Sequence, residues 1–204
     1  MSDDNSLKIV ILGEGRVGKT SILARYFKNK FNEGEQTTIN PSLYEKEVEH
    51  EGKKYKLNFW DTAGQEQFNA INTIYYQNAI GALIVYDVSL FETFNKVKTW
   101  VKTLQEAVGK DIIFVVAGNK FDLVGKNGIN EHESEIDGYC RSQNCKHFFS
   151  SAKTGFQIED VFNSLITSVL NKVKSGKGIN TRKGRRLEIG EEKEEKKESK
   201  GGCC

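Results

Sequence analysis

Gly13-Glu14-Gly15-Arg16-Val17-Gly18-Lys19-Thr20 fits the pattern G-x-x-x-x-G-K-[ST]. Residues 7–12, just before it, form an apolar run rich in β-branched side chains, which is typical of a buried strand. Just after it, apolar residues recur at helical spacing between Ile22 and Phe27. A strand, a glycine loop and a helix in that order are the context that a phosphate-binding loop requires. The alternative, a glycine turn that merely precedes Lys-Thr, does not account for these flanks.

The glycines explain how such a loop binds phosphate. Because Gly13, Gly15 and Gly18 lack Cβ atoms, the backbone can bend so that several N–H groups point into one concavity. The positive end of the following helix attracts the same anion. We expect the Lys19 ammonium to contact the β- and γ-phosphates, and the Thr20 hydroxyl to be a ligand of Mg²⁺.

The bulk properties narrow the class of protein. The 204 residues suit one domain with a tail, and 37% hydrophobic and 28% charged residues are ordinary for a soluble protein. A net charge of +2 is too small to suggest a nucleic-acid-binding protein. Residues 1–6 are polar and acidic, unlike a secretory signal, and no apolar run is long enough to span a bilayer. Cys140 and Cys145 lack metal-site spacing, so we expect reduced thiols in a cytosolic protein.

After the first helix, strands alternate with helices. Residues 29–41 are polar and aperiodic, which predicts a long loop. The periodicity predicts a hairpin of strands at 44–50 and 53–60, further strands at 79–86, 112–117 and 147–149, and helices over about 66–78, 94–104, 131–141 and 158–170. This order predicts an α/β fold with a six-stranded, mostly parallel sheet, one antiparallel strand and about five flanking helices.

Three short motifs follow predicted strands, where ligands of such sheets bind. They are Asp61-Thr62-Ala63-Gly64-Gln65, Asn119-Lys120-Phe121-Asp122 and Ser151-Ala152-Lys153. With the glycine loop, and in this order, they resemble the nucleotide motifs of Ras-superfamily small GTPases. Aromatic-rich stretches at 56–60, 67–68, 75–79 and 83–87 make the chain similar to the Rab group. The resemblance covers about Leu7 to Lys172 and resumes at the last two residues, so it implies a P-loop NTPase G domain.

The Asp61 motif suits the phosphate end of a nucleotide. A carboxylate there can hold Mg²⁺, usually through water. The Gly64 backbone N–H can reach the γ-phosphate where a side chain would obstruct, and Gln65 has the donor and acceptor needed to orient an attacking water. Taken alone, these five residues also fit an ordinary strand-to-helix turn capped by Asp.

The Asn119 motif suits a guanine base. The Asp122 carboxylate can accept from both N1–H and the amino group of guanine, whereas adenine would leave a buried charge unpaired. Asn119 is expected to tie this loop to the phosphate loop and the base, and the Lys120 stem to cover one ring face. Alone, the four residues also fit a polar turn.

The resemblance implies further contacts. The Ala152 N–H would bond guanine O6, and Phe31 would stack on the base edge, although it also fits a loop residue packed on the domain. Thr38 stands where the family has a second Mg²⁺-ligating hydroxyl, in a loop that closes on the γ-phosphate; a loop-cap threonine is the alternative. The expected nucleotide-binding residues are Gly13, Glu14, Gly15, Arg16, Val17, Gly18, Lys19, Thr20, Ser21, Phe31, Thr38, Gly64, Asn119, Lys120, Asp122, Ser151, Ala152 and Lys153; the Mg²⁺ ligands are Thr20, Thr38 and Asp61; the catalytic residues are Gln65 and Lys19.

The two ends of the chain differ from this domain in composition. We expect residues 1–6 to be a tail, 7–173 the GTPase domain, and 174–204 a disordered charged tail rather than a solvated helix. The terminal Gly-Gly-Cys-Cys looks like the Rab double-prenylation site, with lipids on Cys203 and Cys204. Two prenyl chains bind a membrane more tightly than one, whose binding is marginal. The basic residues within 182–186 would add attraction to an anionic leaflet.

The resemblance implies a switch that binds GTP and Mg²⁺, hydrolyses GTP slowly and regulates vesicle and endosomal trafficking. It also implies effectors, an exchange factor, a GTPase-activating protein, a prenylation escort and a GDP-dissociation inhibitor. The expected location is the cytoplasmic face of endomembranes, including the early endosome, with a cytosolic pool. Pro41 and Gln67 depart from the usual pattern at the effector face, which leaves partner identity open. A binding module that hardly hydrolyses GTP and an adenylate-using P-loop kinase are the competing hypotheses; Gly15 with Gln65 argues against the first and Asp122 against the second.

Overall fold

The computed structural model describes residues 5–34, 38, 41–62, 75–124 and 132–176. Within them, six strands form one sheet in the order β2-β3-β1-β4-β5-β6. The strands are β1 (Ser6–Leu12), β2 (Ser42–His50), β3 (Lys53–Asp61), β4 (Ala79–Asp87), β5 (Ile113–Asn119) and β6 (Lys146–Phe149). Strands β2 and β3 pair antiparallel, and the other neighbours pair parallel, which confirms the predicted sheet.

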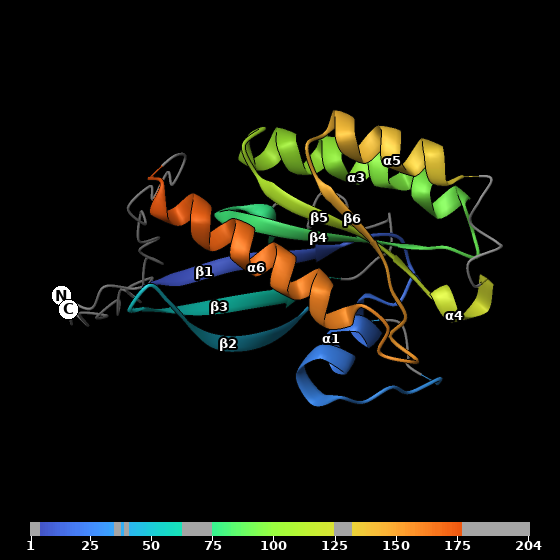
Figure 1. The fold of residues 1–204 in the computed structure, drawn as a ribbon, viewed down its shortest axis with the longest axis horizontal. Helices are drawn as coiled ribbons and strands as arrows, with labels where there is room; N and C mark the ends of the chain where they lie inside the picture. Colours follow the sequence, from blue (N-terminus) through green and yellow to red (C-terminus); the bar gives the residue numbers. More distant parts are fainter. Residues whose placement is uncertain (1–4, 35–37, 39–40, 63–74, 125–131, 177–204) are drawn as a thin grey trace, which may run out of the picture.

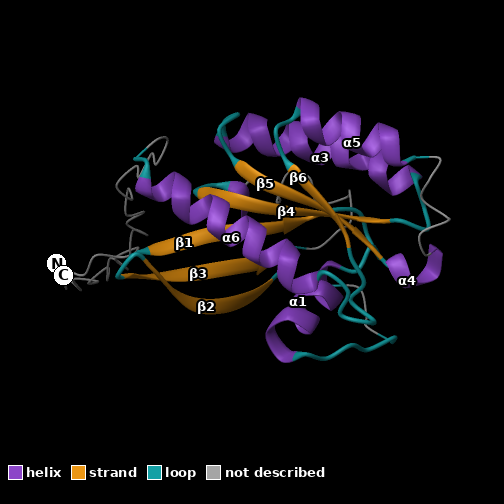
Figure 2. Ribbon diagram, in the orientation of Figure 1, coloured by secondary structure: helices purple, strands orange, loops and turns teal. Residues whose placement is uncertain are grey.

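Helices cover both faces of this sheet (Figures 1 and 2). The helices of the described residues are α1 (Lys19–Lys28), α3 (Glu92–Val108), α4 (Phe121–Val124), α5 (Glu133–Ser142) and α6 (Ile158–Lys174). Side chains of α1 and α6 join the hydrophobic cluster on one face, and those of α3 and α5 join the cluster on the other. The fold is therefore three-layered, as expected of a chain that alternates strands with helices.

Strand β1 is apolar at every position from Ile9 to Leu12, and its place in the sheet explains why. Ile9 and Ile11 point into the cluster beneath α1 and α6, whereas Val10 and Leu12 point into the cluster beneath α3 and α5. Successive side chains of a strand point to opposite faces, so a central strand with both faces covered is apolar at nearly every position. Strand β1 lies between β3 and β4, both parallel to it.

The two long helices follow the predicted periodicity. Each presents one apolar stripe to the sheet, at a spacing of three and four residues. The buried side chains are Phe94, Val97, Trp100, Val101 and Leu104 on α3, and Ile158, Val161, Phe162, Leu165, Ile166, Val169 and Leu170 on α6. Their burial anchors the layers around the sheet and so holds the strand ends in place.

Most of the other helices and strands expected from the sequence are present in the structure. The hairpin, the later strands and the helix predicted over 131–141 are confirmed, the last as α5. Of the helix predicted over 66–78, residues 66–74 lie outside the described part, and Tyr75–Tyr76 are helical. The boundaries at 6/7 and 173/174 remain predictions; β1 begins at Ser6 and α6 runs through Lys174, while residues 177–204 are not described.

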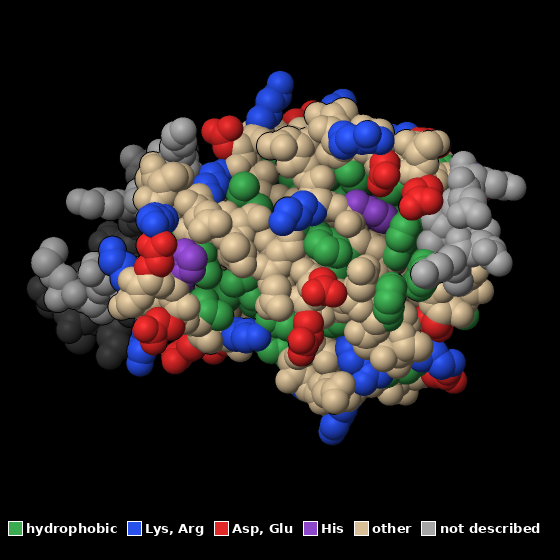
Figure 3. Space-filling model, viewed as in Figure 1, with side chains coloured by type: hydrophobic (Ala, Val, Ile, Leu, Met, Phe, Trp, Pro, Cys, Tyr) green, Lys and Arg blue, Asp and Glu red, His purple; other side chains and the backbone are tan. Residues whose placement is uncertain are grey.

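Two further features concern the surface. In the part of the chain that the structure describes, no helix has the length and apolar character needed to cross a bilayer. On the face shown in Figure 3, basic and acidic side chains are interspersed. This mixture agrees with the small net charge of the sequence.

Candidate nucleotide site

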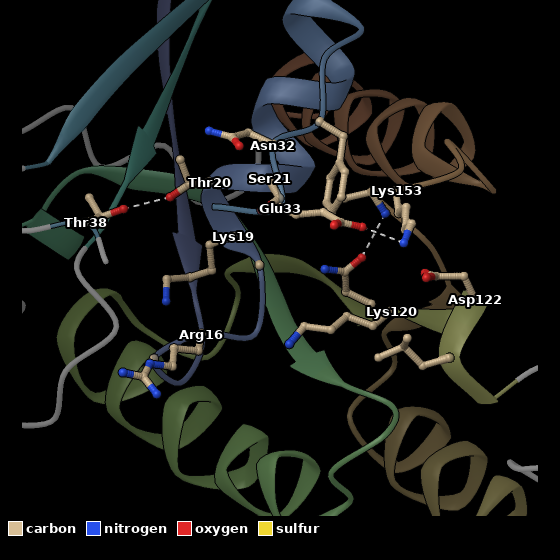
Figure 4. Close-up of a pocket in the computed structure, with 16 residues that line it drawn as sticks. Arg16, Lys19, Thr20, Ser21, Asn32, Glu33, Thr38, Lys120, Asp122 and Lys153 are labelled. Atoms are coloured by element: carbon tan, nitrogen blue, oxygen red, sulfur yellow. Dashed lines mark hydrogen bonds and ion pairs between the residues drawn. The ribbon is translucent and has the colours of Figure 1, made fainter. Parts of the chain in front are cut away.

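A cleft of about 370 Å³ lies where the carboxyl ends of the parallel strands meet the start of α1 (Figure 4). The predicted residues that line it are Gly15, Arg16, Gly18, Lys19, Thr20, Ser21, Phe31, Thr38, Asn119, Lys120, Asp122, Ala152 and Lys153. Five other predicted residues form hydrogen bonds to residues that line the cleft: Gly13, Glu14, Val17, Asp61 and Ser151. Motifs spread over 140 residues therefore converge, as the order of the strands requires.

The glycine loop approaches its neighbours too closely for side chains. A Cβ on Gly13 would stand 2.1 Å from the Val85 carbonyl oxygen, and one on Gly18 would stand 2.3 Å from Asn119 Nδ2. Both residues have positive φ, 139° and 95°, which glycine adopts without strain. The two positions therefore need glycine for packing against β4 and β5 as well as for the turn itself.

Lys19 is the buried cation of the cleft. Its side chain is 6% exposed, and Nζ donates to the carbonyl oxygens of Gly13 and Glu14 at 2.9 Å each. Burial lowers the pKa of Lys19 to about 8, while the carboxylates of Asp61 and Glu14 raise it. The ammonium is thus fixed across the glycine loop, where an anion would compensate its lost hydration.

Three oxygen-bearing side chains meet beside Lys19. The Thr20 hydroxyl donates to Asp61 Oδ2 at 2.6 Å, and its oxygen lies 2.7 Å from the hydroxyl oxygen of Thr38 (Figure 4). Asp61 is fully buried. Two hydroxyls and one carboxylate form a hard, oxygen-only donor set, which suits Mg²⁺, an ion that takes few protein ligands and completes its shell with phosphate and water. The predicted metal ligands therefore fit the ion.

The opposite end of the cleft is a network of amide and carboxylate groups. Asn119, 2% exposed, donates from Nδ2 to the Val17 carbonyl at 2.9 Å, and its Oδ1 accepts from the Ala152 N–H at 3.0 Å. The Ser151 hydroxyl donates to Asp122 Oδ1 at 2.5 Å. The bond to Val17 ties the loop of Asn119 to the glycine loop, as predicted. The engagement of the Ala152 N–H with Asn119 was not predicted.

Two ion pairs at this end were missed by sequence reasoning. Lys120 Nζ lies 2.6 Å from Asp87 Oδ2, and the Asp87 side chain is 3% exposed. Lys153 Nζ lies 2.6 Å from Glu33 Oε1, and both of these side chains are exposed (Figure 4). A signal for Asp87 was available in the sequence, because Asp87 directly follows the apolar run 79–86 and so was expected at the strand-end edge of the sheet. The structure places it opposite Asn119. Glu33 carried no such signal; it lies on the predicted loop, as does Asn32, and both line the cleft together with Leu123.

Some predicted site residues fall outside the described part of the chain. They are Gly64, Gln65, Cys203 and Cys204. Their roles remain predictions from the sequence.

Comparison with known proteins identifies the class that this fold and cleft define. Residues 8–171 match the model of the Ras family. The chain is 39% identical to the human Ras-related protein Rab-21 over 208 residues, which cover 98% of this chain and 91% of the human one. It is 42% identical to Dictyostelium discoideum Rab-21 over 159 residues, 78% of this chain and 74% of that one. Identity to the Saccharomyces cerevisiae GTP-binding protein YPT53 is 39% over 164 residues, 78% of this chain and 74% of the yeast one.

The chain therefore belongs to the Ras family of small GTPases. Within that family it is a Rab-type GTPase of the endosomal branch, a GTP-hydrolysing switch that regulates membrane trafficking. Members of the family bind GTP or GDP together with Mg²⁺.

Proposed function

We propose that the cleft holds a guanine nucleotide with its phosphates at the glycine loop and its base between Asn119, Asp122 and the loop after β6. The observation that carries this proposal is the partly buried bond from the Ser151 hydroxyl to Asp122 Oδ1, 2.5 Å long. It fixes the carboxylate beside the cleft, where it can accept from the N1–H and amino group of guanine. Adenine offers no such pair and would leave a charge unsatisfied.

The phosphate end is proposed to work by positioning and charge. Thr20, Thr38 and Asp61 are the residues that would hold Mg²⁺. When bound, this ion supplies positive charge that offsets the charge developing on the transferred phosphoryl group. The Lys19 ammonium, already held in the glycine loop, is near enough to neutralise the β- and γ-phosphates. Gln65 orients the attacking water, and a partner supplies the arginine that stimulated hydrolysis needs.

The Thr20–Thr38 contact supports a switch mechanism. Thr38 belongs to the segment between α1 and β2, and its hydroxyl reaches Thr20 on α1. A metal shared with the γ-phosphate would favour this closed position, and loss of that phosphate would release the segment. We propose that effectors, an exchange factor, a GTPase-activating protein and a GDP-dissociation inhibitor read this difference.

Membrane attachment is proposed to use the Cys203 and Cys204 thiols. Two prenyl chains, added with the help of an escort protein, would hold the switch on the cytoplasmic face of endosomal membranes, with a soluble pool in the cytosol. Support comes from the terminal sequence and from the similarity to Rab-21 proteins. Imaging the full chain beside a Cys203→Ser, Cys204→Ser variant tests this; a variant that stays on endosomes would contradict it.

Competition measurements test the nucleotide assignment. Fluorescent GDP bound to the wild type should be displaced by GTP and not by ATP or XTP. In Asp122→Asn, the amide no longer accepts from both guanine donors but can donate to O2 of xanthine. XTP should therefore displace the fluorescent nucleotide from this variant, and GTP should bind to it more weakly. Equal displacement by ATP and GTP from the wild type would refute the proposal.

A further inference from the structure

Arg25, on α1, makes four hydrogen bonds that join distant parts of the site. Its Nε–H donates to the Ala152 carbonyl at 2.7 Å, and Nη2 donates to the Lys153 carbonyl at 2.6 Å. Its Nη1 donates to the carbonyl and the Oδ1 of Asn29, at 3.2 and 3.0 Å. One half-buried guanidinium thus fastens the end of α1 to the loop after β6.

That loop controls both side chains expected to face the base. Ser151 holds Asp122 Oδ1, and the Ala152 N–H holds Asn119 Oδ1. The loop also bonds to itself, from the Gly155 N–H to the Ser151 carbonyl at 2.8 Å. The carbonyls of Ala152 and Lys153 instead face α1, where Arg25 binds them. Displacement of this loop would therefore disturb the Asp122 carboxylate.

The same helix carries the phosphate end of the cleft. Lys19 and Thr20 form the first turn of α1, and Arg25 lies less than two turns further along. A second link to the loop, from Glu33 to Lys153, is exposed on both sides, and such pairs contribute little. Charge-assisted bonds from a planar guanidinium to two carbonyls are stronger and fix direction. Beside the buried Asn119, which bonds Val17 and Ala152, Arg25 is therefore the side chain that fixes the loop after β6 to α1.

We propose that Arg25 is a positioning residue for guanine recognition: by holding the Ala152 and Lys153 carbonyls it keeps Asp122 aligned, and so sets both the residence time of the nucleotide and the discrimination against bases that lack the 2-amino group. This inference rests on the proposed function. It assigns Arg25 no contact with the nucleotide, because the side chain acts through the loop.

The test is the release rate of fluorescent GDP and of fluorescent IDP, the hypoxanthine analogue without the 2-amino group. Arg25→Ala should release GDP about tenfold faster than the wild type, since net losses of this order follow the removal of charge-assisted bonds. IDP release should change less, so the ratio of IDP to GDP release rates should fall. Arg25→Lys keeps the charge but not the fork and should lie between the two proteins. Glu33→Gln should change GDP release by less than about threefold.

Arg141→Ala is the matched control. Arg141 also donates Nε–H to a carbonyl, that of Asp137 at 3.3 Å, but within α5 and at an exposed position, so its loss should leave both release rates unchanged. Arg25→Ala with GDP release equal to this control would overturn the inference. An equal acceleration of GDP and IDP release would also overturn it, because that is the effect of general loosening. If Arg25→Ala does not fold, the ratio in Arg25→Lys decides. Failure of the proposed function looks different: the wild type would then bind neither nucleotide.

Discussion

Replacing Asn119 by alanine should weaken the protein more than any other single amide substitution at the site. The change removes the bond from Nδ2 to the Val17 carbonyl, 2.9 Å, and the bond from the Ala152 N–H to Oδ1, 3.0 Å. Val17, Asn119 and Ala152 are each at most 2% exposed, so water cannot readily replace the lost partners. Each buried polar group left without a hydrogen-bond partner, here the Val17 carbonyl and the Ala152 N–H, costs about 1–3 kcal/mol. After partial relaxation, the free energy of unfolding should fall by about 3 kcal/mol.

Urea unfolding at a fixed excess of GDP should show at least this loss, because weaker GDP binding adds to it. GDP release measured in parallel should accelerate by at least about a hundredfold. Asn58→Ala is the matched control, because Asn58 Nδ2 donates to the Ser6 hydroxyl at 2.7 Å on a half-buried part of the sheet far from the cleft. It should lose about 1 kcal/mol and leave GDP release unchanged. Equal unfolding midpoints for the two variants would refute the bridging role of Asn119.

Three further predictions concern the loop, the sheet and hydrolysis. Gly13→Ala places a methyl group 2.1 Å from a β4 carbonyl, so urea unfolding should show a loss of about 3 kcal/mol; Gly52→Ala, which also has positive φ but open space, should lose only about 1 kcal/mol. Burial lowers the pKa of His147 to about 4. As the pH falls, His147 is therefore protonated in the unfolded chain at a higher pH than in the folded chain. Stability is then full above pH 6.5 and falls by about 3 kcal/mol toward pH 4, and His147→Gln should flatten this part of the profile. Gln65→Leu should lower stimulated GTP hydrolysis by orders of magnitude in a phosphate-release assay; wild-type turnover with a stimulating protein would reject its role.

The sheet was readable from sequence because burial on both faces leaves a distinct pattern. Residues 7–12 and 79–86 are apolar at nearly every position, and the structure places both strands at the centre of the sheet. The convergence of Lys19, Thr20, Asn119 and Asp122 followed from the same order of elements, since the carboxyl ends of parallel strands share one edge.

The contacts that hold the site together were not readable in the same way. Arg25 and Glu33 stand in stretches whose charges look like those of any solvated surface, whereas Asp87 ends a buried apolar strand. Their partners, Ala152, Lys153 and Lys120, lie up to 128 residues away in the chain. Such pairings depend on how α1 and the strand ends are packed, which local periodicity does not encode. The bond from the Ala152 N–H to Asn119 likewise depends on how the loops after β5 and β6 pack together.

The nucleotide content of the purified full chain tests the central claim most directly. Protein isolated in the presence of Mg²⁺ should release stoichiometric GDP or GTP on acid denaturation, and chromatography should find no adenine nucleotide. Stripped protein should take up GDP again, and removal of Mg²⁺ should speed its loss. A chain that emerges empty and takes up neither GDP nor GTP with Mg²⁺ present would contradict the account.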